Sequence, residues 1–145
     1  MKKHNGMRPH DIVILLKIVS KGAVSWYNKD LAQELFISSS EVSESLHRSM
    51  IAGLIDPSKK IVFVNALIDF LEHGLKYVFP VQRGAITKGV PTAHSAPVLN
   101  GIFKSDEIFV WPDPEGNFRG QEIEALYPTI FKAISLDKKL YDLLA

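Results

Sequence analysis

The residues of this sequence best suited to binding chemistry lie in a serine-rich segment between residues 39 and 48. Six polar side chains recur there at helical spacing, so a helix would place them on one face. They are Ser39, Ser40, Ser43, Glu44, His47 and Arg48. Near the N-terminus of a helix, free N–H groups and the positive end of the dipole assist such side chains in binding phosphate oxygens. The same groups can also bond to base edges, so the segment is a candidate binding face.

A preceding helix and a tight turn would position this face. Asn28 is a favoured N-cap residue for that helix, because its side chain can accept a bond from a first-turn N–H. Its apolar stripe consists of Leu31, Ala32 and Leu35, and the helix closes at Phe36-Ile37.

The second helix has its own start, stop and buried face. Ser38-Ser39-Ser40-Glu41 is a capping box, in which a hydroxyl and a carboxylate each bond to the other residue's N–H. Val42, Leu46 and Met50 are spaced for the buried face, and Gly53 tolerates a left-handed stop.

Residues 28–55 resemble the helix-turn-helix of winged-helix regulators, in particular the MarR-like group. The resemblance rests on three pieces at the expected spacing, which are Asp30-Leu31-Ala32, Ser38-x-x-x-Val42-Ser43 and Ala52-Gly53-Leu54-Ile55. The sequence departs from the pattern at Phe36, where a turn glycine is frequent, and at Ser49, where a core leucine is usual. Extended over residues 10–75, the resemblance implies double-stranded DNA binding by a homodimer that regulates transcription.

A turn and a β-branched run follow the second helix. Residues 56–60 have turn chemistry and residues 61–64 suit a strand, so the pair reads as a hairpin. The alternative is a solvated turn, but beside a helix-turn-helix the hairpin is expected to be the wing. Lys59 and Lys60 at its tip, together with Lys29, would contact the DNA backbone, while the six residues of the binding face read bases or phosphates.

The predicted fold class is α+β and mainly helical, in two parts. Residues 1–75 form a winged helix-turn-helix of three helices and a β-hairpin wing, and the first helix spans residues 9–20. A further helix runs from Asn65 to Leu75, with Gly74 as a weak point or bend; by resemblance it helps to form the dimer. An apolar stripe of this kind would suit packing within the chain equally well.

Residues 76–145 form a loop-rich extension. Residues 78–91 are expected to be an ordered loop with at most a short strand, because glycine and proline recur there. Residues 108–111 and 118–120 are expected to form a hairpin, and residues 133–144 a terminal helix in which Asp137 lies inside or marks a new start.

Composition excludes several classes of site. The chain has no cysteine, so disulfides, thiol catalysis and cysteine-ligated metals are excluded. The five histidines are scattered, and no metal or cofactor site is expected. Gly84 and Gly89 have P-loop spacing, but Val90-Pro91 follows in place of Lys-Ser/Thr, which argues against an NTPase. Thr92-Ala93-His94-Ser95 lacks any evidence of a facing nucleophile and base, so no catalytic residue is assigned.

Apolar runs in the sequence are too short for a membrane helix. The longest aliphatic run, residues 12–16, falls far short of the roughly 20 residues required. No signal peptide is evident, so a cytoplasmic protein without a membrane partner is expected.

Charge is unevenly distributed, although the net charge is only +1. Residues 1–64 hold nine Lys/Arg and six Asp/Glu, whereas residues 65–145 hold eight and ten. No acid occurs between Glu72 and Asp106. That stretch is either a phosphate-binding region or a loop solvated by its lysines.

Two other function classes remain open from the sequence. One is an antitoxin-like or adaptor protein, whose Met50, Ile51 and apolar C-terminus would bind a partner protein. The other is a ligand sensor or nucleic-acid enzyme that uses residues 77–120. A pocket lined by basic side chains would favour the second class. The candidates for that lining are Arg83, Lys88, His94 and Arg119.

Overall fold

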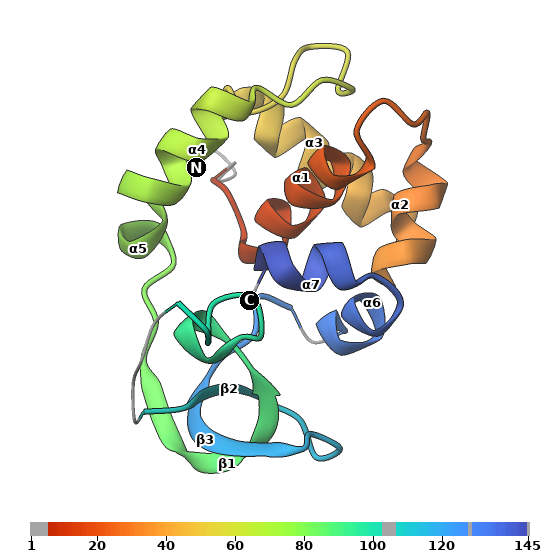
Figure 1. Cartoon of the computed structure of the whole chain (residues 1–145). Coiled ribbons are helices and arrows are strands. Elements are labelled where there is room, and N and C mark those ends of the chain that lie inside the picture. The colour runs from red at the N-terminus through yellow and green to blue at the C-terminus, as the bar shows by residue number, and fades with distance from the viewer. Residues whose placement is uncertain (1–5, 103–106, 128, 145) are drawn as a thin grey trace, which may run out of the picture. The chain divides into compact units, whose positions relative to one another are not determined.

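The computed structural model describes residues 6–102, 107–127 and 129–144, except for the side chains of residues 94 and 136 (Figure 1). Within these residues the chain is α+β, with seven α-helices and one mixed sheet of three strands. It divides into two compact units, which are residues 1–79 with 126–140 and residues 80–125 with 141–145. The division after residue 79 lies close to the predicted boundary at 75, but residues 126–140 return to the first unit.

Helix α1 (Pro9–Lys21) forms the centre of the first unit. Proline occupies its first turn, and Gly22, with φ of 61°, follows its last residue, as the sequence predicts. Residues 11–18 are buried without interruption, so this helix is covered on every side.

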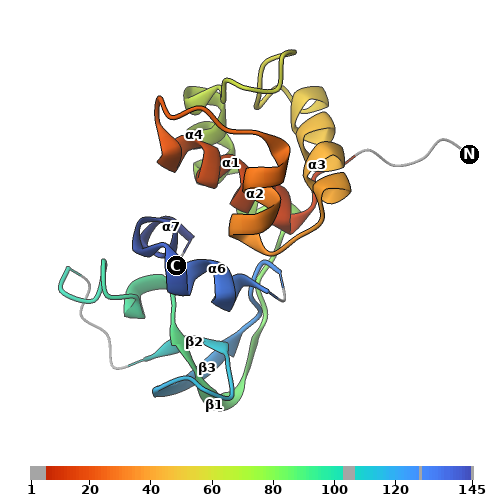
Figure 2. The ribbon, with the colours of Figure 1, turned by 90° about the vertical axis from the view of Figure 1, so that its right-hand side faces the viewer.

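Helices α2 (Asn28–Leu35) and α3 (Ser39–Ile51) both pack against α1 (Figure 2). The predicted N-cap at Asn28 is wrong by one residue, because Tyr27 is the cap and its N–H donates to the Asp30 carboxylate at 2.8 Å. Three residues, Phe36 to Ser38, connect α2 to α3, so the predicted short turn is confirmed.

The predicted hairpin after α3 is reduced to one bridge. Ile55 and Val62 pair antiparallel, and no strand forms on either side of them in this described stretch. The Asp56 carboxylate accepts the N–H groups of Lys60 at 2.9 Å and Ile61 at 2.8 Å. A side chain therefore takes the donors that a longer ladder would use, and a two-stranded wing does not form.

Helices α4 (Val64–His73) and α5 (Leu75–Val78) are separated at Gly74, where the sequence predicts a bend. Near the C-terminus, α6 (Ile130–Leu136) and α7 (Lys138–Leu144) are separated at Asp137. The carboxylate of Asp137 accepts the Leu140 N–H at 3.0 Å and pairs with Lys17 of α1. Asp137 thus marks a new helix start, and its ion pair joins the C-terminal helices to the first unit.

The second unit is a small closed sheet of β1 (Arg83–Pro91), β2 (Phe109–Pro112) and β3 (Phe118–Ile123), with a 3₁₀ turn, η1 (Ala93–Ser95). The expectation of a loop over residues 78–91 is wrong, because β1 has nine residues. The expected hairpin is also wrong. Strands β2 and β3 are parallel to each other, and each is antiparallel to β1.

Glycine permits this tight closure. A Cβ at Gly89 would lie 2.0 Å from the Trp111 carbonyl oxygen, so only glycine allows β1 to approach β2 there. Trp111 is buried and meets the Tyr141 ring edge to face, with centroids 6.2 Å apart. The Tyr141 hydroxyl donates to the Pro91 carbonyl, so the end of α7 completes this unit.

None of the helices in the described residues has the length and apolar character needed to cross a membrane.

Candidate nucleic-acid interface

The exposed face of α3 carries most of the predicted binding residues. On the opposite face, Val42 and Leu46 are buried against the other helices. The sequence therefore predicts correctly the solvent side of the helix at five of six positions. Those five exposed residues are Ser39, Ser40, Ser43, Glu44 and His47.

A defined turn fixes where α3 begins. Phe36 adopts the left-handed conformation, with φ of 59°, and the next N–H, of Ile37, donates to the Ala32 carbonyl at 3.1 Å. This 6→1 bond is typical of a Schellman end. Ser38 Oγ then accepts the Glu41 N–H at 3.2 Å, which is the serine half of the predicted capping box. Between these two described residues the reverse bond, from the Ser38 N–H to the Glu41 carboxylate, is not formed.

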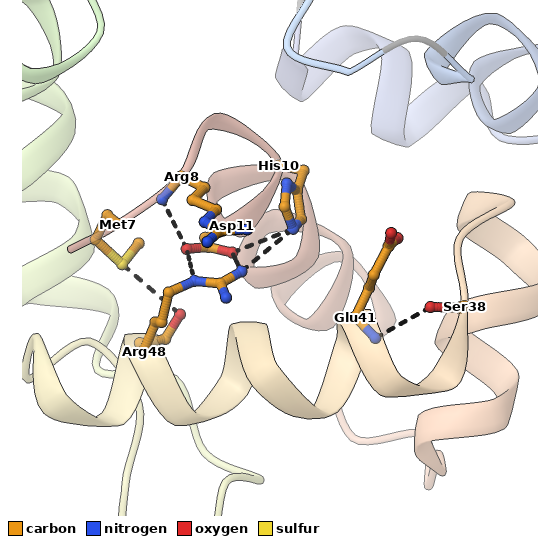
Figure 3. A network of polar contacts seen from close by, with 8 residues as sticks. Met7, Arg8, His10, Asp11, Ser38, Glu41 and Arg48 are labelled. Carbon is orange, nitrogen blue, oxygen red and sulfur yellow. Dashed lines mark hydrogen bonds and ion pairs between the residues drawn. The ribbon is translucent and has the colours of Figure 1, made fainter. Parts of the chain in front are cut away.

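Arg48 does not belong to the exposed face, and its assignment as a DNA-contacting residue is corrected. Its side chain is buried, with the residue 7% exposed. Its Nε donates to Asp11 Oδ2 at 2.9 Å and its Nη2 to Oδ1 at 2.7 Å (Figure 3). The guanidinium forks onto a carboxylate of α1, so it holds α3 in place instead of meeting a ligand.

The buried face of α3 is rotated relative to the prediction. Ser45 and Ser49 are fully buried, whereas Met50 is only half-buried. Short serines on this face leave room beside α1 for the large guanidinium. Ser49 thus lies on a face of α3 that is joined to α1 by an ion pair and not by apolar packing alone.

The network around Asp11 extends to the first residues of α1. The Arg8 N–H donates to Asp11 Oδ2 at 2.8 Å, and His10 Nε2 lies 3.3 Å from Arg48 Nη2. Burial raises the pKa of Asp11, but the bonds from Arg48 and Arg8 outweigh it and hold this pKa below its ordinary value. Burial lowers the pKa of His10. At neutral pH the network therefore consists of a carboxylate, a guanidinium and a neutral imidazole.

Two of the three predicted backbone-contacting lysines meet at an aromatic pair that the sequence reading missed. Lys60 Nζ donates to the Trp26 carbonyl at 2.9 Å and lies 4.0 Å from the Trp26 ring centroid. Lys29 and Lys60 both lie within 6 Å of the Tyr27 ring, which is 67% exposed. Lys59, directly before Lys60 in the sequence, is half-buried and has φ of 62°. The sequence feature that could have indicated this cluster is the Trp26-Tyr27 pair directly before α2.

The alternative pocket of residues 77–120 is formed only in part. Arg83 pairs with Glu107 at 3.6 Å, while Lys88 and Arg119 line an open groove; the side chain of His94 lies outside the described residues. Among the described side chains no group of three or more His, Asp or Glu could hold a metal ion.

Comparisons with known proteins give no relative whose function could be transferred to this site. No protein-family model, no curated protein and no solved structure matches the chain. The geometry consists of an exposed polar helix face, a buried ion pair behind it and a lysine-aromatic cluster at the start of α2. Such an arrangement is suited to recognition through hydrogen bonds and Coulomb attraction.

Proposed function

We propose that this protein binds double-stranded DNA sequence-specifically through α3, as a dimeric transcription regulator. The observation that carries the proposal is the exposed polar face of α3. It offers hydroxyl, carboxylate and imidazole groups from the first turns of a helix that is fixed from behind. A helix presented across a short turn can enter a major groove.

Each group on the face has a role in recognition. Serine hydroxyls donate to phosphate oxygens or base acceptors, Glu44 accepts from a cytosine amino group, and His47 donates to a base or phosphate. Lys29, Lys59 and Lys60 contribute affinity through the backbone without sequence information. Arg48 acts as a positioning residue, because its fork on Asp11 sets the rotation of α3.

The small number of positively charged side chains indicates that a single chain would bind DNA weakly. Glu41 and Glu44 are both exposed on α3, and only three lysines are assigned to the backbone. Few phosphate contacts give a shallow salt dependence and a low affinity at physiological salt. A dimer doubles the contacts, and α4 offers an exposed apolar side that includes Val64 and Ile68.

The test is a fluorescence-anisotropy titration with a duplex pool from the protein's own upstream region, at several salt concentrations. Ser43→Glu places a negative charge on the exposed face of α3, and we expect affinity to fall about tenfold or more from phosphate repulsion. Ser135→Glu, at an exposed position of α6, is the matched control and should change affinity less than about twofold. Equal affinities for both variants and the wild type would contradict recognition through α3.

The adaptor alternative is favoured by exposed apolar residues near the end of α3. Ile51, Ile61 and Phe63 are all exposed, although such side chains usually lie in a core. Under this alternative the wild-type chain binds no duplex even at low salt. It would instead form a complex with a partner protein, which Ile51→Glu weakens and Ser135→Glu does not.

A further inference from the structure

The sheet of the second unit places two cations opposite each other. Lys88 of β1 and Arg119 of β3 are antiparallel partners in the strand register, and both side chains are exposed. Directly opposite residues of antiparallel strands have Cβ atoms about 5 Å apart. Like charges at that separation repel, so the pair destabilises the free sheet unless an anion lies between them.

Among the residues that the structure describes, no carboxylate forms an ion pair with Lys88 or Arg119. Asp113 lines the same groove but has another role: its Oδ1 accepts the Glu115 N–H at 3.1 Å and so stabilises its own turn. Its N–H donates to the Lys88 carbonyl at 3.1 Å, which fixes the turn to β1. The acid that lines the groove thus shapes it without forming an ion pair with either cation.

Arg83, at the other end of the same strand, has an acidic partner. Its Nη1 lies 3.6 Å from a Glu107 carboxylate oxygen, and its guanidinium lies 4.8 Å from the Phe109 ring centroid. The lack of an ion pair at Lys88 and Arg119 among the described residues is therefore local, since Arg83 of the same strand pairs with Glu107.

The two cations line an open groove of about 510 Å³, which is in the size range of small-ligand sites. Its other walls include Ile86, which is 64% exposed, and the rings of Pro112 and Pro114. Gly116 lies against β1, because a Cβ there would be 2.4 Å from the Gly89 carbonyl oxygen. The groove therefore combines fixed walls, apolar surface and two cations that form no ion pair within the described residues.

We propose that this groove is a phosphate-binding site for a nucleotide or a nucleic-acid strand. The Arg119 guanidinium would donate two parallel bonds to phosphate oxygens, and the Lys88 ammonium would add a point charge beside it. Ile86 and the two prolines provide apolar contact for the sugar or base attached to that phosphate. The site does not depend on DNA recognition by α3, because it lies in the other unit.

The experiment uses the full chain and a short fluorescein-labelled single-stranded oligonucleotide, followed by anisotropy at low salt. The double variant Lys88→Gln, Arg119→Gln should bind about a hundredfold more weakly, since each charged contact contributes about tenfold. Arg83→Gln is the matched control, because it removes one positive charge from the same sheet; it should change affinity about twofold or less. Far-UV circular dichroism should be unchanged, because both altered side chains are exposed, and the thermal unfolding midpoint should stay the same or rise slightly, because the repulsion between them is removed.

Arg119→Lys distinguishes a bidentate hydrogen bond to phosphate from nonspecific Coulomb attraction. It keeps the charge but loses the paired donors, and about a tenfold weaker affinity is expected for a bidentate contact. If Arg83→Gln weakens binding as much as the double variant, or if the wild-type chain binds no oligonucleotide, the phosphate site is ruled out.

Competition identifies the source of the phosphate. Displacement of the oligonucleotide by adenosine monophosphate identifies a free nucleotide as a sufficient ligand. Resistance to it, with a salt slope about one to two units smaller in the double variant, identifies backbone phosphates of a strand. Ser43→Glu should leave both results unchanged, so failure of the α3 proposal is distinguishable from failure of this one.

Discussion

The two units of the molecule contain cations in contrasting environments. In the first, Arg48 is buried and its guanidinium forks onto Asp11, which is fully buried in α1. In the second, Lys88 and Arg119 are exposed, opposite each other and without an acidic partner among the described residues. Arg48 therefore holds the first unit together, whereas Lys88 and Arg119 of the second are exposed to solvent.

The physical reason for the difference is the cost of desolvation. A buried charge is tolerated only when a partner compensates for the lost water, so Arg48 and Asp11 must be read together. An exposed cation keeps its water and needs no partner in the fold. Repulsion between two neighbouring cations then favours the binding of an anion between them. The location of the nearest carboxylate therefore indicates the role of an arginine better than its position in a sequence pattern does.

The largest effect is expected from breaking the buried pair. Arg48→Ala leaves the Asp11 carboxylate buried without its fork and should cost about 3–5 kcal/mol of unfolding free energy. Arg83→Ala, which removes an arginine from an exposed pair of the second unit, should cost about 0–1 kcal/mol. Urea unfolding followed by circular dichroism measures both values. A loss below about 1 kcal/mol for Arg48→Ala would mean that the pair does not hold α3 to α1.

Replacing both partners sharpens this result. Asp11→Leu with Arg48→Met removes both charges and fills a similar volume, so much of the stability lost in Arg48→Ala should return. If the double variant is as unstable as the single one, packing volume and not uncompensated charge explains the loss.

A smaller effect is expected from titrating the same network. Burial depresses the pKa of His10; Asp11 and Glu41 act against that shift, and Arg48 and Arg8 reinforce it. Because the folded pKa lies below the ordinary 6.5, the folded state binds fewer protons than the unfolded chain. Stability should therefore be full above pH 6.5 and decline as the pH falls through the folded pKa of His10.

His10→Gln isolates this contribution. The variant should lose the slope just below pH 6.5 but keep the decline in more acidic solution, where Asp11, whose pKa is held below its ordinary 3.8, takes up its proton. Thermal unfolding midpoints between pH 7 and pH 3 measure both steps. An unchanged slope in His10→Gln would remove His10 from the network.

Helices of the first unit are predictable from the sequence because their signals are local. Pro9 and Gly22 bracket α1, Ser38 caps α3, and the apolar spacing identifies which side of α3 is buried. The role of Arg48 is not predictable in this way. It lies at the edge of the exposed face, and its partner is 37 residues away in the sequence.

In the second unit the decisive contacts are long-range, so local signals mislead. The glycines of β1 resemble loop residues, but Gly89 is required where two strands approach closely. The proline-rich turn between β2 and β3 is typical of a hairpin, but both strands pair with successive parts of β1. The facing of Lys88 and Arg119 follows from that register alone, so spacing along the chain could not reveal it.

The smallest effect concerns backbone strain. Among the described residues, Phe36 in the first unit and Ala93 in the second are, besides Lys59, the non-glycine residues with positive φ. Phe36 has φ of 59° and Ala93 has φ of 54°, and both conformations cost roughly 1–2 kcal/mol for an L-residue. Glycine removes the strain but adds about 0.4–1 kcal/mol of unfolded-chain entropy. Ala93→Gly should therefore gain about 0.5 kcal/mol by urea unfolding. Phe36→Gly should gain nothing or lose slightly, because its ring, whose centroid lies 5.9 Å from Lys132 Nζ, is lost as well. A gain at Phe36 larger than at Ala93 would show that the ring contributes nothing and that the turn before α3 is the more strained of the two.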